Sequence, residues 1–97
     1  MSQSDIRSLD IGMIRTFDAL MRERSVSRAA ARLFLSQPAV SASLARLRKI
    51  FNDPLFIRTG HGVSPTPKAL RLAPKIEKTL FEFSALFDEE LDFSPGQ

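Results

Sequence analysis

The chain contains 97 residues, of which 43% are hydrophobic and eight are phenylalanine. This composition supports one small domain with a single core and excludes a disordered chain. The absence of cysteine excludes disulfides and thiolate metal sites. A polar N-terminus and the lack of an apolar run of about 18 residues predict a cytoplasmic protein without a secretory signal or a membrane partner.

Charge is distributed unevenly along the chain, whose net charge is +3. Residues 22–71 contain ten Lys or Arg but two acids, Glu23 and Asp53, a net charge of +8. From Glu77 onward, six acids stand against Lys78, a net charge of −5. A basic segment of this kind favours a polyanionic partner, and an ordinary solvated basic face is the alternative.

A first helix is expected from Asp10, which can cap its N-terminus, to about Arg24. One side of this helix carries apolar residues at helical spacing: Ile11, Ile14, Phe17, Leu20 and Met21. Such a stripe is typical of a surface that faces a core. The helix is therefore expected to support the rest of the domain.

A short second helix is expected from the cap Ser25 to about Leu33, followed by a turn at residues 34–36. The alanines at 29–31 are small enough for a neighbouring helix to cross closely, as in a helix-turn-helix. Phe34 occupies the turn position that often holds glycine. Because a positive φ would strain phenylalanine, we expect the turn to use another backbone conformation.

The third helix is expected to begin after the cap Ser36 and to end near Phe51. Its inward residues are Val40, Leu44, Leu47 and Phe51. At about 100° per residue, the opposite side carries Pro38, Ser41, Ala42, Ala45, Arg46 and Lys49. This face has no large side chain before Arg46, so it can approach another molecule closely. The major groove of DNA admits such a helix, and another protein surface is the alternative.

The start of this helix offers residue types that read DNA bases. Gln37 can donate to and accept from adenine, Ser41 can pair with either kind of base edge, and Pro38 or Ala42 can contact a thymine methyl. We therefore predict Gln37, Pro38, Ser41 and Ala42 as base-reading residues. The residues expected to contact the DNA backbone are Ser27, Arg28, Ser36, Arg46, Lys49 and Arg58.

A two-stranded wing is expected after Pro54, with strands at 55–58 and 63–65 and a turn at 59–62. Arg58 is expected to contact phosphate or the minor groove. Gly60 and His61 form the predicted wing tip, where a plain turn residue is the alternative for His61. Because His61 has no second histidine or cysteine to join it, we expect no metal site and no cofactor.

A long last helix is expected after the cap Thr66, with Pro67 in its first turn. Its apolar seam has heptad-like spacing and comprises Ala69, Ala73, Ile76, Leu80, Phe83 and Phe87. Such a helix projects beyond a core this small, so its distal part is expected to pair with a second copy. Pro74 predicts a kink.

The segments SVSRAAARL, SQPAVSASLARL, DPLFIR and GVSPT resemble the N-terminal domain of LysR-type transcriptional regulators. The resemblance implies a mainly α fold in which residues 1–66 form a winged helix-turn-helix, three helices plus a two-stranded wing. Residues 67–91 would form a dimerisation linker helix and residues 92–97 a hinge or the end of the chain. It also implies a homodimer or higher homo-oligomer and a small-molecule effector bound only by a C-terminal domain outside these residues.

Individual positions can be carried over from this resemblance. Gln37, Pro38 and Ser41 match base-reading positions, and Arg58 matches a wing arginine that contacts the DNA backbone. Ala42 stands where many members have a base-reading arginine. Arg48 replaces a common acid and is expected to add charge near the DNA backbone.

The leading hypothesis is therefore sequence-specific binding of double-stranded DNA by a dimeric bacterial transcriptional regulator. The alternative is a winged-helix module for protein interaction or oligomerisation without sequence-specific DNA binding. An enzyme is not expected, because the sequence has no Ser/His/acid grouping at a rigid site and no Gly-rich phosphate loop after a strand.

Overall fold

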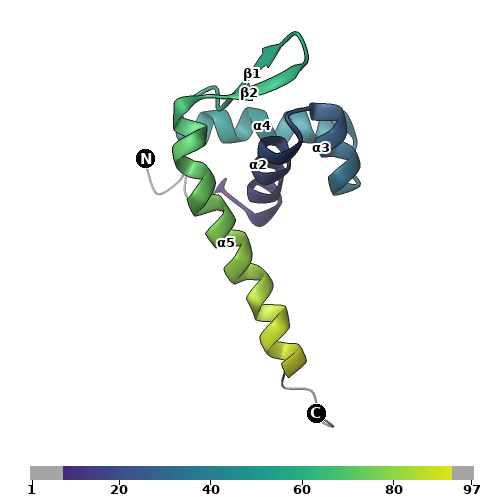
Figure 1. The fold of residues 1–97 in the computed structure, drawn as a ribbon, viewed down its shortest axis with the longest axis vertical. Coiled ribbons are helices and arrows are strands. Elements are labelled where there is room, and N and C mark those ends of the chain that lie inside the picture. Colours follow the sequence, from purple (N-terminus) through teal and green to yellow (C-terminus); the bar gives the residue numbers. More distant parts are fainter. Residues whose placement is uncertain (1–7, 93–97) are drawn as a thin grey trace.

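The computed structural model describes residues 8–92, with side chains described as far as residue 88. Its elements are α2 (Ile11–Glu23), α3 (Val26–Leu33), α4 (Gln37–Phe51), β1 (Phe56–Thr59), β2 (Gly62–Pro65) and α5 (Pro67–Asp92) (Figure 1). The helical order and the two-stranded wing confirm the expected winged helix-turn-helix followed by a long helix. Residues 93–97, most of the expected hinge, lie outside the described residues.

The predicted N-caps of α2, α3 and α4 are confirmed. In each case a side-chain oxygen accepts a hydrogen bond from a first-turn N–H: Asp10 from Met13 at 2.9 Å, Ser25 from Arg28 at 3.2 Å and Ser36 from Ala39 at 3.2 Å. These bonds satisfy donors that a helix start leaves unpaired. Because a cap involves residues three apart, local sequence is enough to place the start of each helix.

The expectation for Phe34 was wrong. Phe34 is the C-cap of α3 and adopts the left-handed conformation, with φ 57° and ψ 40°. Its N–H donates to the carbonyls of Ala30 and Ala31, and the N–H of Leu35 also donates to Ala30, at 2.9 Å. These bonds close the helix and reverse the chain tightly, which offsets the strain of a positive φ. The residue is 94% exposed, so its side chain has room in this conformation.

Replacing Phe34 by glycine is expected to raise the free energy of unfolding by roughly 0.5 to 1 kcal/mol, because glycine adopts φ 57° without the Cβ clash. Urea denaturation measures the change. Ala31→Gly is the matched control, because Ala31 is an exposed residue within α3 where glycine is expected to lower stability. A loss of stability in Phe34→Gly would contradict the prediction.

Helix α2 lies at the centre of the fold, in contact with α3, α4 and α5. Of its predicted stripe, Ile14, Phe17 and Leu20 are buried, while Ile11 and Met21 are partly buried. Packing on several sides also buries residues outside that stripe, namely Met13, Thr16 and Ala19. The buried Thr16 hydroxyl donates to the Gly12 carbonyl at 3.0 Å, so its polar atom is satisfied.

The helix-turn-helix crossing also differs in detail from the expectation. Ala29 and Ala30 are buried between helices, but Ala31 is exposed. On α4, the predicted inward residues Val40, Leu44 and Leu47 are buried, whereas Phe51 is only partly buried. Ser43 and Ile50 are also buried. A helix face in contact with two neighbours is wider than a four-residue stripe, which explains these additional positions.

The wing is a two-stranded antiparallel sheet whose register pairs Phe56 with Pro65 and Thr59 with Gly62. The predicted strand starts were each displaced by one residue, and the turn contains only the two residues between Thr59 and Gly62. The wing is fixed to the body where the Val63 N–H donates to the Arg24 carbonyl at 2.9 Å. A Cβ on Gly62 would collide with that carbonyl oxygen, so glycine is required there.

Helix α5 begins after Thr66, whose hydroxyl oxygen accepts from the Ala69 N–H at 3.1 Å and so confirms the predicted cap. The helix is continuous from Pro67 to Asp92 with Pro74 inside it, and the kink at Pro74 stays a prediction. Its first half packs on α2 and β2, and the remainder projects away from the domain (Figure 1). Within residues 8–92, no helix is long and apolar enough to cross a membrane.

Candidate nucleic-acid interface

The first turns of α4 present the predicted reading face to solvent. Gln37, Pro38, Ser41 and Ala42 are all exposed. The same side continues with three further exposed residues, Ala45, Arg46 and Lys49. Helical periodicity therefore identified the exposed side correctly. Because Ser41, Ala42 and Ala45 are small, this side of α4 can approach a convex or grooved surface closely.

A small cleft joins α4 to two other elements. Its volume is about 160 Å³, and it is lined by Ser25, Val26, Ser27, Gln37, Arg58, Gly62 and Val63. The start of α3, the start of α4 and the wing thus converge, which brings Ser27, Gln37 and Arg58 to one place. The wing reaches this position because Val63 is hydrogen-bonded to Arg24, the residue immediately before Ser25.

Some basic residues are paired with acids, whereas those predicted to contact DNA are not. Arg22 and Arg32 form ion pairs with Asp18 and Glu23, with N–O distances of 3.0 and 2.7 Å. Those predicted to contact the DNA backbone are exposed and, within the described side chains, form no ion pair: Arg28, Arg46, Lys49 and Arg58. Positive charge close to α4 and the wing is therefore not neutralised by neighbouring acids, which favours an anionic partner.

The remaining predicted residues are also at the surface. Ser27 and Ser36 are exposed at the starts of α3 and α4. Gly60 and His61 are exposed and form the tip of the wing, where the His61 N–H donates to the Thr59 hydroxyl at 3.3 Å. This bond uses the backbone N–H of His61, so the imidazole ring takes no part in it.

Arg48 makes contacts within the domain that the sequence did not predict. Its guanidinium donates to the carbonyls of Pro54 and Phe56, both at 2.8 Å. The chain reverses after α4 and turns these carbonyls toward the helix, where the planar guanidinium can reach both of them. Arg48 therefore supports the base of the wing, and its added charge near the DNA backbone stays a prediction.

Sequence reasoning also missed the role of Asp53. One carboxylate oxygen accepts from the Thr66 hydroxyl at 2.7 Å and from the Leu55 N–H at 2.9 Å. These hydrogen bonds, the Thr66 bond contributing most, hold the pKa of Asp53 below its ordinary value. An Asp before Pro is a turn signal, but a partner 13 residues away leaves no local signal.

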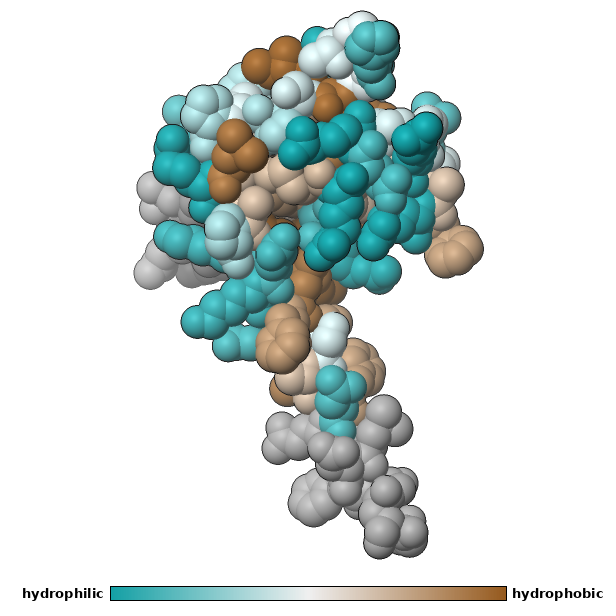
Figure 2. Space-filling model, in the orientation of Figure 1, coloured by the Kyte–Doolittle hydropathy of each residue, from teal (hydrophilic) through white to brown (hydrophobic). Residues whose placement is uncertain are grey.

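Part of the predicted apolar seam of α5 packs against the domain of the same chain. Ala69 and Ile76 are buried, Ala73 and Leu80 are half-buried, and Phe83 and Phe87 are 39% and 63% exposed. The last two rings contact each other edge to face, with centroids 6.0 Å apart. Apolar side chains gather on the projecting part of α5 (Figure 2), and they include two residues outside the seam, Phe81 and Leu86.

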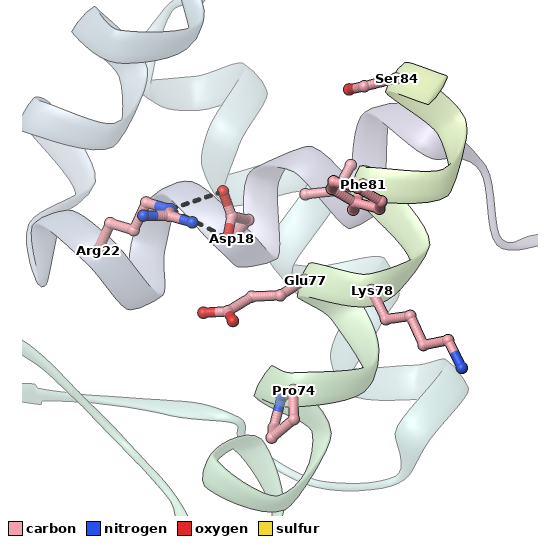
Figure 3. A pocket seen from close by; sticks show the side chains of 8 residues that line it. Asp18, Arg22, Pro74, Glu77, Lys78, Phe81 and Ser84 are labelled. Carbon is pink, nitrogen blue, oxygen red and sulfur yellow. Dashed lines mark hydrogen bonds and ion pairs between the residues drawn. The ribbon is translucent and has the colours of Figure 1, made fainter. Parts of the chain in front are cut away.

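A groove of about 640 Å³ lies between α2 and this part of α5. Its lining combines apolar and charged side chains: Asp18, Arg22, Pro74, Glu77, Lys78, Leu80, Phe81 and Ser84 (Figure 3). The Asp18–Arg22 ion pair lies on the α2 side, and its hydrogen bonds raise the pKa of Arg22. Within the groove, only Leu80 belongs to the predicted seam.

A sequence profile described as bacterial regulatory helix-turn-helix protein, lysR family, matches residues 11–70. The chain belongs to the LysR family. The match begins with α2 and ends in the first turn of α5, so it covers the helix-turn-helix, the wing and the junction with the long helix. Most of α5 lies outside the matched LysR segment.

Individual LysR relatives support this assignment. The chain is 42% identical over 80 residues to the transcriptional regulator LeuO of Escherichia coli K12, covering 82% of this chain and 26% of LeuO. It is 49% identical over 74 residues to nodulation protein D 1 of Neorhizobium galegae, covering 76% of this chain and 24% of that protein. The chain therefore spans about a quarter of the length of these relatives.

Solved structures show the same fold. A probable transcriptional regulator, PA0477 from Pseudomonas aeruginosa, superposes with a TM-score of 0.83 at 38% identity, covering 97% of this chain and 32% of that one. The DNA-binding domain of BenM, solved with catB site 1 DNA, superposes with a TM-score of 0.82 at 22% identity, covering 92% of this chain and 100% of that one. The second likeness establishes the winged-helix fold shared with a LysR member.

Proposed function

We propose that this chain is the DNA-binding part of a bacterial LysR-type transcriptional regulator and that it binds double-stranded DNA sequence-specifically as a dimer. The observation that carries the proposal is the convergence of Ser27, Gln37 and Arg58 on one cleft beside the exposed small-residue face of α4. Residues 1–66 form the DNA-binding unit and residues 67–91 the dimerisation helix. The activity is binding without catalysis, carried out in the bacterial cytoplasm.

In this proposal α4 lies in the major groove. The groove is about 12 Å wide, close to the diameter of a helix with its side chains, about 10–12 Å. Small residues on the leading face therefore allow the helix axis to come near the bases. Gln37 and Ser41 form hydrogen bonds to base edges, while Pro38 or Ala42 contacts a thymine methyl group. All four are exposed at the start of the helix.

The phosphates on both sides of the groove are bound by exposed residues of three elements: Ser27, Arg28, Ser36, Arg46, Lys49 and Arg58. The wing tip at Gly60 and His61 reaches the backbone or the minor groove. Contacts to phosphate release counterions, so the affinity falls as salt concentration rises. They orient the domain, and they supply affinity without reading sequence.

Arg58→Ala is expected to weaken binding to every duplex by a similar factor and to reduce the slope of log affinity against log salt by about one. The reason is that Arg58 is an exposed wing cation that contacts phosphate in the proposed complex. Fluorescence anisotropy at several salt concentrations measures this. Arg22→Ala removes the same charge from an ion pair on α2 and serves as the control, with a much smaller expected change. A sequence-selective loss in Arg58→Ala would contradict the role.

The dimer forms through the projecting part of α5. Phe81, Phe83, Leu86 and Phe87 are exposed there in a single copy. An apolar cluster of this kind is stabilised when a second copy covers it. Two-fold symmetry then places two α4 helices in successive major grooves of a partly palindromic site. A small-molecule effector binds only to a C-terminal domain outside this chain.

The proposal is tested by duplex binding and light scattering on the 97-residue chain. The proposal predicts that the chain binds duplex DNA with an affinity that falls as salt rises, and that it prefers some sequences over others. It also predicts that light scattering gives a molar mass twice that of the chain. An intact dimer that shows no salt-dependent affinity for duplex DNA would support the alternative, a winged-helix module that binds other proteins. Selection of bound duplexes from a random pool then identifies the half-site and its symmetry.

A further inference from the structure

Helix α4, the wing and helix α5 meet at one junction, formed by residues 51–56 and 66–68. Two separate hydrogen-bonded ties hold α5 there. In the first, the Thr66 hydroxyl donates to Asp53 at 2.7 Å, and the Thr66 N–H donates to the Leu55 carbonyl at 2.8 Å. In the second, Lys68 Nζ donates to the Phe51 carbonyl at 2.6 Å. The first turn of α5 is therefore bound to both ends of the segment that follows α4.

The chemistry of each tie makes it stronger than a neutral hydrogen bond. The Phe51 carbonyl lies at the C-terminus of α4, where the last carbonyls have no partner within the helix and carry partial negative charge. The Lys68 ammonium complements that charge. Asp53 is an ionised acceptor for two donors at once, Thr66 and Leu55. Bonds to charged groups are shorter and stronger than those between neutral groups.

The first of these ties also holds a strained turn. Leu55 is completely buried and has φ 62°, and the Phe56 N–H donates to the Pro54 carbonyl at 2.6 Å. This pattern is a three-residue γ-turn, which is costly for a residue with a Cβ. Asp53 binds the Leu55 N–H and Thr66 binds its carbonyl, so the turn is fixed on both sides. The junction is therefore held in one conformation by hydrogen bonds on both sides of Leu55, unlike a freely moving hinge.

Small rotations at this junction have large effects at the far end of α5. The helix has 26 residues, about 39 Å at 1.5 Å per residue. A change of about 10° in its direction would move the distal end by about 7 Å, the rise of roughly two base pairs at 3.4 Å each. The separation of two half-sites in a dimer is therefore sensitive to how firmly the first turn of α5 is held.

We infer that Asp53, Thr66 and Lys68 are positioning residues that fix the angle between α5 and the α4–wing unit, and so set the half-site spacing that the dimer accepts. None of the three touches DNA in this role. The inference rests on the proposed function, because it requires a DNA-bound dimer held together by α5.

The test is selection from a pool of random duplexes, performed with the 97-residue chain and with Thr66→Val and Lys68→Met. The wild-type chain is expected to enrich one half-site sequence at a single spacing. Both variants are expected to enrich the same half-site sequence. The ratio of enrichment between the most favoured half-site spacing and the second most favoured spacing is expected to fall about tenfold, which corresponds to the loss of one hydrogen bond to a charged group. Affinity for duplexes that contain a single half-site is expected to stay unchanged.

Two controls separate positioning from folding. Thr66→Ser keeps the hydroxyl and is expected to restore the single spacing. Lys78→Met removes the same charge from an exposed lysine on α5 and is expected to retain that spacing. Lys68→Met leaves the cap of α5 intact, so it remains informative if Thr66→Val unfolds.

Retention of the single wild-type spacing by Lys68→Met, or by both variants, would overturn the inference. Loss of the half-site sequence itself would also overturn it, because the residues would then act in base reading or folding. A wild-type chain that enriches no sequence would instead overturn the proposed function.

Discussion

Replacing Gln37 by alanine is expected to remove roughly 1 to 3 kcal/mol of preference for the selected operator over random DNA, the discrimination that one bidentate base contact supplies. Gln37 is exposed at the first position of α4 and lines the cleft shared with Ser27 and Arg58. Its amide can donate and accept at the same time, and alanine can do neither. Anisotropy titrations on the selected duplex and on a random duplex measure the difference.

The affinity of Gln37→Ala for random DNA is expected to stay close to that of the wild type, because the phosphate contacts are retained. Alanine is a good helix former, so the stability of α4 should also be retained. The matched comparison is Arg58→Ala, which is expected to lose affinity on both duplexes. An equal loss on the two duplexes in Gln37→Ala would show that this residue does not read bases.

Phe17→Ala is expected to lower the free energy of unfolding by about 3 to 5 kcal/mol, the usual cost of removing a buried aromatic ring. Phe17 is completely buried, and its ring meets that of Phe56 edge to face, with centroids 5.3 Å apart and an angle of 67°. The substitution therefore leaves a cavity between α2 and the base of the wing. Urea denaturation at a fixed protein concentration measures the loss, since dimer stability depends on concentration.

Phe34→Ala is the control, because it deletes the same ring from a side chain that is 94% exposed. Surface substitutions usually change stability by less than about 0.5 kcal/mol. If the two substitutions had equal costs, the assignment of Phe17 to the centre of the core would be wrong. Because Phe56, at the start of the wing strand that carries Arg58, packs on Phe17, we also expect Phe17→Ala to weaken DNA binding.

Local signals explain why the helices could be predicted. Each cap joins residues three apart, and the exposed side of α4 follows from the helical period alone. The positions at which the structure differs from the sequence prediction depend on contacts between residues farther apart in the chain. Among residues 8–92, left-handed conformations occur at the non-glycine residues Arg24, Phe34, Asn52 and Leu55. Sequence reasoning expects glycine at such positions, because the bonds that hold another residue there are not visible in the sequence.

The wing and its junction illustrate the same physical limit. The first strand begins one residue later than predicted because Leu55 forms a γ-turn instead of entering β1. Arg48 was assigned to the DNA side because its charge was evident, whereas its carbonyl partners depend on how the chain reverses after Asn52. The partners in the Asp53–Thr66 and Lys68–Phe51 bonds are 13 and 17 residues apart. Contacts over such separations are decided by tertiary packing.

The caps, the helical periods and the small-residue face of α4 follow from the amino-acid sequence alone, because each depends on residues within one or two turns. Tertiary structure decided that Ser27, Gln37 and Arg58, from three different elements, meet at one cleft. It also decided how much of the α5 seam remains free. Ala69 and Ile76 are covered by the domain, whereas Phe83 and Phe87 stay exposed because the helix extends beyond the core.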